Sequence, residues 1–129
     1  MNISVNQSSI RRILYGNAVF SGMSGLLFIF AARPVADFIG LDTSLAILLI
    51  GIGLLGYAAL LYINASRAEI SRSFVLLAII ADTTWALLSV LLLLTGWVSF
   101  SVEGKWVVGI LAVIVDIFAT LQFLEWRKM

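Results

Sequence analysis

Two aspartates, Asp82 and Asp116, are the residues of this chain with the clearest potential for chemistry. Each interrupts a long apolar segment that contains no Lys or Arg. An aspartate at the centre of a membrane helix costs roughly 2.5–3.5 kcal/mol on insertion scales, so it is usually retained for a proton, an ion or a polar ligand group. Both aspartates are therefore candidate binding residues.

The two carboxylates are expected at nearly the same depth in a membrane. Asp82 lies ten residues after Arg72, and Asp116 lies eleven residues before Arg127. At 1.5 Å per helical residue these spacings are about 15 and 16 Å from one membrane boundary. Two ionised acids close together in a low dielectric repel each other, so at least one should hold a proton near neutral pH. The sequence predicts a midplane aspartate pair, if the two side chains face each other.

Helical spacing places other small or polar residues on the faces that carry these acids. The predicted ligand- or proton-binding set consists of Asp82, Asp116, Asn17, Ser21, Trp85, Ser89 and Thr120. On the last segment the inward face is predicted to contain Gly109, Ala112, Asp116, Thr120 and Phe123, and on the second segment Gly53, Gly56, Tyr57 and Asn64. A structural reading stays open, in which the acids only lock the helices together through hydrogen bonds. Asn17, Asn64 and Gln122 are expected close to the cytoplasmic ends, in interfacial or interhelical hydrogen bonds. The alternative is that they line a cytoplasmic entrance to the same cavity.

The elements that must hold these residues are four membrane-length helices. Hydrophobic residues make up 62% of the 129-residue chain, well above the share in soluble domains. Charged residues divide it into spans at about 12–33, 43–66, 72–95 and 105–126, each long enough to cross a bilayer as a helix. We expect an all-α membrane protein: one domain over residues 1–129, formed by four transmembrane helices in an up-down-up-down bundle.

The distribution of basic residues predicts the orientation of this bundle. Six of the eight basic residues lie at the two termini and in the middle connection, namely Arg11, Arg12, Arg67, Arg72, Arg127 and Lys128. Only Arg33 and Lys105 lie on the other side. The positive-inside rule then places both termini in the cytoplasm of a multi-pass protein of the bacterial inner (plasma) membrane. In the first outer connection two readings stay open: a short interfacial helix that starts at Pro34, and an ordinary ordered loop.

Composition excludes several kinds of chemistry. The chain has no cysteine and no histidine, which rules out disulfides, His- or Cys-ligated zinc or haem, and a histidine-assisted nucleophile. No cofactor and no metal site are expected, and no residue is assigned a catalytic role. The net charge of +1 gives no basic surface for nucleic acid.

Known classes of small membrane proteins fit poorly. Intramembrane aspartyl proteases need Tyr-Asp and Gly-x-Gly-Asp motifs, whereas the contexts here are Ile80-Ala81-Asp82 and Ile114-Val115-Asp116. Small multidrug transporters carry an acid in the first helix, where this chain has Asn17. Two short stretches, 12–14 and 20–22, resemble the start of DoxX-like four-helix proteins of bacteria. That resemblance covers few residues and implies no site residue.

Three functions are consistent with the sequence. The first is a bundle core that binds a proton, a cation or an amphiphilic, lipid-like ligand at the aspartate pair, with a role in transport. The second is a non-catalytic accessory or structural subunit of a larger membrane complex. The third, a small enzyme that uses the carboxylates for acid–base chemistry on a lipid-soluble substrate, is the least favoured. Expected partners are membrane lipids and either a second copy, as a dimer, or another membrane protein.

Overall fold

The computed structural model describes residues 7–129 and is all-helical over that range. The long helices are α1 (Ser8–Phe30), α3 (Leu45–Ala65), α4 (Arg72–Thr95) and α5 (Val102–Trp126), and a short helix, α2 (Ala32–Ile39), follows α1. All four long helices are long and apolar enough to cross a membrane. This confirms the prediction of an all-α protein with four long apolar helices that could span a membrane; the predicted domain also includes residues 1–6, which lie outside the described residues.

The first predicted span differs most from the helix that the structure shows. The prediction was 12–33, whereas α1 ends at Phe30 and α2 begins at Ala32. Pro34 explains the break, because a proline has no N–H to donate to the carbonyl four residues earlier and its ring clashes with that carbonyl. Here that carbonyl belongs to Phe30, where α1 ends. Of the two readings for this connection, the short helix is therefore present, but it begins two residues before Pro34.

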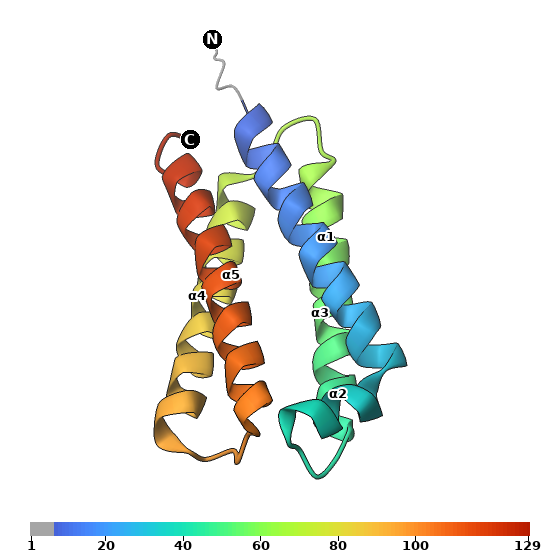
Figure 1. The fold of residues 1–129 in the computed structure, drawn as a ribbon. Coiled ribbons are helices and arrows are strands. Elements are labelled where there is room, and N and C mark those ends of the chain that lie inside the picture. Colours follow the sequence, from blue (N-terminus) through green and yellow to red (C-terminus); the bar gives the residue numbers. More distant parts are fainter. Residues whose placement is uncertain (1–6) are drawn as a thin grey trace.

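The long helices form two hairpins, one of α1 with α3 and the other of α4 with α5 (Figure 1). Contacts between the hairpins are far fewer and run mainly from α1 to α5, with α2 reaching both α3 and α5. In Figure 1 the start of α1, the α3–α4 connection and the end of α5 lie at one end of the molecule. We call this the terminal end, and the other, which holds α2 and the α4–α5 connection, the α2 end.

Within the first hairpin, α1 and α3 approach closely because glycines face each other. A Cβ added at Gly25 would lie 2.8 Å from the carbonyl oxygen of Gly51, and one added at Gly51 would lie 2.9 Å from the carbonyl oxygen of Gly25. Both glycines are buried. Backbone-to-backbone packing of this kind is how small residues stabilise membrane helix pairs.

At the terminal end the first hairpin holds the connection to the second. The Arg11 guanidinium donates to the carbonyl oxygens of Ala65, Arg67 and Ala68, the last two at 2.7 and 3.2 Å. Gln7 pairs with the backbone of Ile70 in both directions, at 2.8 and 3.2 Å. A buried apolar cluster lies beneath these contacts and contains Ile10, Leu14, Ala18, Leu61, Ala65, Ile70, Val75 and Ala78.

At the α2 end the end of α2 packs against the start of α5. The Ser101 N–H donates to Ile39 O at 2.9 Å and the Ser101 hydroxyl to Phe38 O at 2.7 Å. The same hydroxyl caps α5 by accepting from the Gly104 N–H at 2.9 Å. Gly40 ends α2 with a φ of +90°, a conformation that glycine adopts without the steric cost of a Cβ.

Substitution of Gly104 by alanine is expected to disrupt this α2–α5 contact. A Cβ at Gly104 would lie 2.8 Å from Ile39 Cα, so the two segments would have to separate, at a cost of about 1–3 kcal/mol. The measurement is the free energy of unfolding in mixed micelles titrated with a denaturing detergent. Gly109→Ala is the matched control on the same helix, since its new Cβ would meet only Leu93 Cδ1, at 3.9 Å. Equal stability of both variants would contradict the prediction.

Candidate functional site

Asp82 lies at the centre of a buried polar cluster between the two hairpins. It is 4% exposed and accepts three hydrogen bonds. Its Oδ2 accepts from Asn17 Nδ2 at 2.8 Å and from Gln122 Nε2 at 3.0 Å, and its Oδ1 accepts from the Tyr57 hydroxyl at 3.0 Å. Both carboxylate oxygens are therefore engaged by protein donors.

The remaining bonds of the cluster bind its members to one another. Asn17 Nδ2 also donates to Gln122 Oε1 at 2.9 Å, and the Ser21 hydroxyl donates to Asn17 Oδ1 at 3.1 Å. Asn17 is 2% exposed, Ser21 3% and Gln122 0%. We refer to Asn17, Ser21, Tyr57, Asp82 and Gln122 as the polar cluster.

Each of the four long helices contributes to the polar cluster. Asn17 and Ser21 lie one turn apart on α1, and the other three residues come singly from α3, α4 and α5. The helix contacts between the two hairpins are few, so this network is the main polar connection between them in the middle of the bundle. Its first chemical role is to satisfy a carboxylate that water does not reach.

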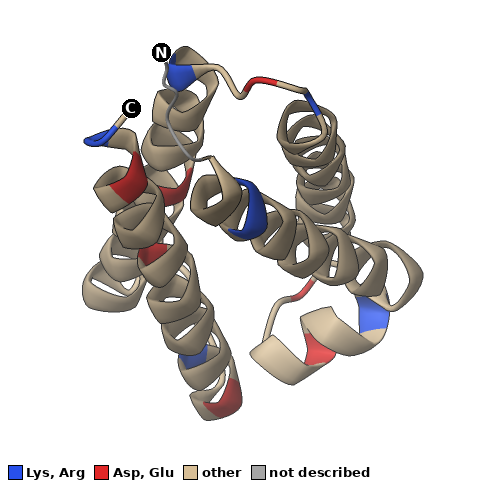
Figure 2. Ribbon diagram, turned by 90° about the horizontal axis from the view of Figure 1, so that it is seen from above, with Lys and Arg blue, Asp and Glu red and all other residues tan. Residues whose placement is uncertain are grey.

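All three groups that donate hydrogen bonds to the Asp82 carboxyl group are neutral. Among residues 7–129 the ion pairs are Arg33–Asp37 and Lys128–Glu125, and neither involves Asp82. Figure 2 shows the basic residues at or near the ends of the helices and in the connections. Two amide N–H groups and one phenol O–H therefore replace the solvation of the carboxylate. The described residues contain no group of three or more acidic side chains that could hold a metal ion.

Asp116 is not part of this cluster, which corrects the prediction of an aspartate pair. Its side chain is exposed on the surface of α5, and no hydrogen bond or ion pair among residues 7–129 involves it. Thr120, one turn further along, is exposed as well. The structure therefore brings together Asp82, Asn17 and Ser21 of the predicted set, and leaves Asp116 and Thr120 outside.

The inward faces of α5 and α3 differ from the predicted ones. The buried stripe of α5 is Ala112, Val115, Ala119 and Gln122, in place of the stripe through Asp116. On α3 it is Ile47, Gly51, Ala58, Leu61 and Ala65, while Gly53 and Gly56 face open space. Small residues decide both faces, because they allow a neighbouring helix to approach closely.

Gln122 and Tyr57 are the cluster members that the predicted set did not include. Gln122 was expected in interfacial or interhelical hydrogen bonds, and it makes interhelical ones, to Asn17 and Asp82. A usable signal existed: Gln122 follows Ala112, Val115 and Ala119 at helical spacing, so it falls on the same stripe. Asn64, another amide expected near a cytoplasmic end, donates to Leu60 O of its own helix at 2.9 Å.

Trp85 and Ser89 line a cavity that begins beside the polar cluster. They follow Asp82 by one and two turns on α4, toward the α2 end, and the Ser89 hydroxyl donates to Trp85 O at 2.8 Å. The cavity measures about 410 Å³, a size within the range of small-molecule sites. Its other lining residues are apolar and come from all five helices, among them Phe28, Val35, Ile47, Leu88, Leu92, Val108 and Leu111.

Trp85 also has a buried indole N–H. This nitrogen has no hydrogen-bond partner among residues 7–129, and the same is true of the indole nitrogen of Trp126, which does not line the cavity. A buried donor without an acceptor costs about 1–3 kcal/mol.

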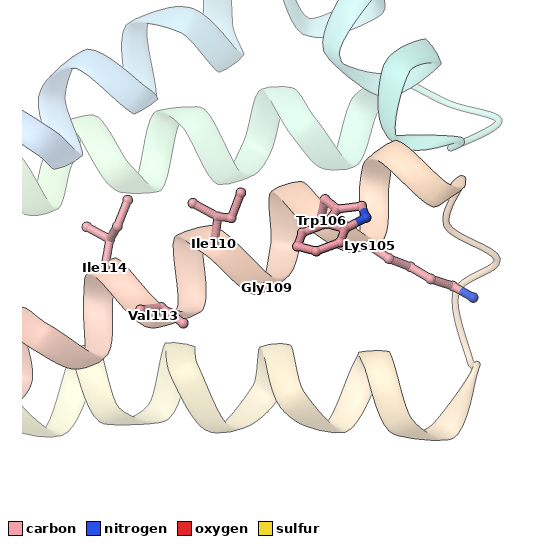
Figure 3. A pocket seen from close by; sticks show the side chains of 6 residues that line it. All are labelled: Lys105, Trp106, Gly109, Ile110, Val113 and Ile114. Atoms are coloured by element: carbon pink, nitrogen blue, oxygen red, sulfur yellow. The ribbon is translucent and has the colours of Figure 1, made fainter.

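A second hollow lies on the surface of α5 (Figure 3). It measures about 500 Å³ and is lined only by residues of that helix: Lys105, Trp106, Gly109, Ile110, Val113 and Ile114. It contains no member of the polar cluster. The two hollows therefore differ in kind, since one is lined by residues of all five helices and is partly open, and the other lies along one helix.

Comparison with known proteins gives no further information about the site. No protein-family model, no curated protein and no solved structure matches the chain. The short likeness to DoxX-like proteins therefore has no support from a family match. What the site binds has to be inferred from its own geometry.

Proposed function

We propose that this protein binds an amphiphilic, lipid-like molecule inside its bundle, in the cavity beside the polar cluster. The observation that carries the proposal is the cavity of about 410 Å³, which is apolar except for the polar atoms of Trp85 and Ser89 among its lining residues. A suitable ligand has an apolar chain or ring system and a carbonyl or hydroxyl oxygen. The oxygen would lie near Trp85 and Ser89, and the apolar part would pack against the other lining residues.

The state of Asp82 favours this ligand over a bare cation. Both of its carboxylate oxygens already accept hydrogen bonds from the protein. A cation would have to displace at least one of these donors and leave it buried without an acceptor. The polar cluster is better suited to close the inner end of the cavity, because an apolar chain gains nothing by displacing it.

The proposed setting is a bacterial inner membrane, with the terminal end in the cytoplasm and the helices running up-down-up-down. The terminal end contains six of the eight basic residues, as the positive-inside rule requires of a cytoplasmic side. The cavity then lies in the outer half of the bilayer, because its α4 residues follow Asp82 toward the α2 end.

The test is quenching of Trp85 fluorescence by a dibrominated long-chain fatty alcohol in detergent micelles. The other three tryptophans, Trp97, Trp106 and Trp126, are first replaced by phenylalanine. We expect quenching to saturate as the mole fraction of the probe rises, because a single site fills. Val108→Phe should fill part of the cavity and weaken saturable quenching.

Leu49→Phe is the matched control, because Leu49 is 58% exposed on α3 and does not line the cavity. The Trp85 fluorescence of Leu49→Phe should be quenched by the probe to the same extent as that of the parent protein. Quenching that rises linearly with probe content, equally in all three proteins, would contradict a ligand site in the cavity.

A second function, a non-catalytic subunit of a membrane complex, is favoured by one specific observation. The five members of the polar cluster form one continuous hydrogen-bond network, as expected of a purely structural brace. In that case Trp85 quenching would not saturate, while substitutions in the cluster would still lower stability.

A further inference from the structure

The exposed carboxylate of Asp116 points to an interaction surface on α5. The residue lies eleven positions before Arg127, which is about 16 Å along the helix and near the middle of a bilayer. Its side chain is exposed and has no hydrogen-bond or ion-pair partner among residues 7–129. In a monomer it would therefore face acyl chains, the least favourable surroundings for an acid.

The surface around Asp116 has the composition of a membrane helix contact. Gly109, Val113, Asp116 and Thr120 follow at positions i, i+4, i+7 and i+11, so they share one face of α5. Gly109 presents no side chain, and a Cβ placed there would meet nothing closer than Leu93 Cδ1, at 3.9 Å. The hollow in Figure 3 includes Gly109 and Val113, so this face is concave toward the α2 end. Small and hydrogen-bonding residues together are what associating membrane helices use.

We propose that this face of α5 joins two copies of the chain in a symmetric dimer. The face supplies both halves of the contact that it needs: Asp116 accepts, and the exposed Thr120 hydroxyl, one turn away, donates. A two-fold axis along the membrane normal sets two α5 helices side by side in the same direction. Asp116 of each copy then accepts from Thr120 of the partner subunit, so the contact is made twice.

A second copy explains the surface better than a partner with a basic residue at this depth. The dimer requires no charge beyond those of the chain, since a threonine hydroxyl satisfies the acid. The dimer is independent of the ligand proposal, because neither Asp116 nor Thr120 lines the cavity beside the polar cluster.

Disulfide cross-linking in membranes tests the proposal directly, because the chain has no cysteine of its own. Under mild oxidation, Val113→Cys should give a covalent dimer of twice the chain mass. Ile52→Cys is the matched control, since Ile52 on α3 is 54% exposed and Val113 is 59% exposed. Equal cross-linking of both variants, no cross-linking, or a product of another mass would each overturn the proposal.

The role of the carboxylate itself is tested by its removal. Asp116→Leu should raise the dissociation constant of the dimer in detergent about tenfold, because two interhelical hydrogen bonds are lost. Asp116→Asn, which can still accept from threonine, should stay close to the parent. Because the position is exposed, Asp116→Leu should fold like the parent protein. Its helical circular dichroism checks this. A folded Asp116→Leu protein that dimerises as well as or better than the parent would overturn the proposal.

Discussion

Substitution of Asn17 by leucine is expected to destabilise the bundle by about 3 kcal/mol. Asn17 bonds to three other members of the polar cluster, namely Ser21, Asp82 and Gln122, as many as Asp82 itself does. Its loss leaves a buried carboxylate with one donor fewer and the Gln122 carbonyl oxygen with none. Removal of one partner of a buried hydrogen-bonded group is costly for this reason. The measurement is the free energy of unfolding in a mixed-micelle titration.

The double variant Asn17→Leu/Asp82→Leu separates this explanation from simple loss of packing. Once Asp82 is also replaced by leucine, no buried acid remains that needs Asn17 as a hydrogen-bond donor. The double variant should then lose less stability than the sum of the single losses, by about 1–3 kcal/mol. Met23→Leu, on the exposed face of α1, is the control and should be nearly neutral. Strictly additive losses would show that Asn17 and Asp82 do not depend on each other.

Substitution of Gly51 by alanine is the second change with a large expected effect. The new Cβ would lie 2.8 Å from Phe28 Cβ and 2.9 Å from Gly25 O, so α1 and α3 would have to move apart along their closest contact. We expect a loss of about 1–3 kcal/mol or slightly more, because a backbone atom cannot move aside as a flexible side chain can. The change would be read from the same unfolding titration and from the fraction of folded protein in size-exclusion chromatography.

Gly53→Ala provides a matched control two residues along the same helix. A Cβ at Gly53 meets nothing within 4 Å, so only the helix preference of alanine over glycine remains, roughly 0.5–1 kcal/mol in favour of the variant. The two variants should therefore differ in sign. If both were equally destabilising, the close crossing of α1 and α3 would be wrong.

The helices were predictable from sequence because charge and apolar length determine them almost alone. The predicted third span, 72–95, coincides with α4, since Ser71 caps its start and Gly96 ends it. The first span was harder, because an uncharged sequence continues past Phe30 and only the effect of Pro34 on the preceding backbone ends the helix. Interruptions of an apolar run by backbone chemistry leave little trace in hydropathy.

The site was harder to predict than the helices, because it depends on which way each helix faces. Asp82 and Asn17 were identified, since both lie on stripes of small and polar residues. Asp116 was assigned inward because it shares a helix face with Gly109, Ala112 and Thr120, and membrane helix contacts favour small and polar residues. The rotation of α5 follows instead from Ala112, Val115 and Ala119, whose small side chains let the neighbouring helices pack. A single sequence contains no information on a partner that would make the exposed position of Asp116 acceptable.

The pairing of helices into sequential hairpins also has a consequence for biogenesis. Each hairpin consists of segments that are close in the chain, so α1 and α3 can associate before α4 and α5 leave the ribosome. Docking of the two halves comes last and relies on few helix contacts besides the polar cluster. Until that step, Asn17 and Tyr57 lack the hydrogen-bond acceptor that Asp82 supplies in the folded protein. The first hairpin before docking, with these donors unpaired, is therefore the form that a chaperone or quality-control protease would recognise. This undocked form should persist longer when synthesis of the second half of the chain is slowed.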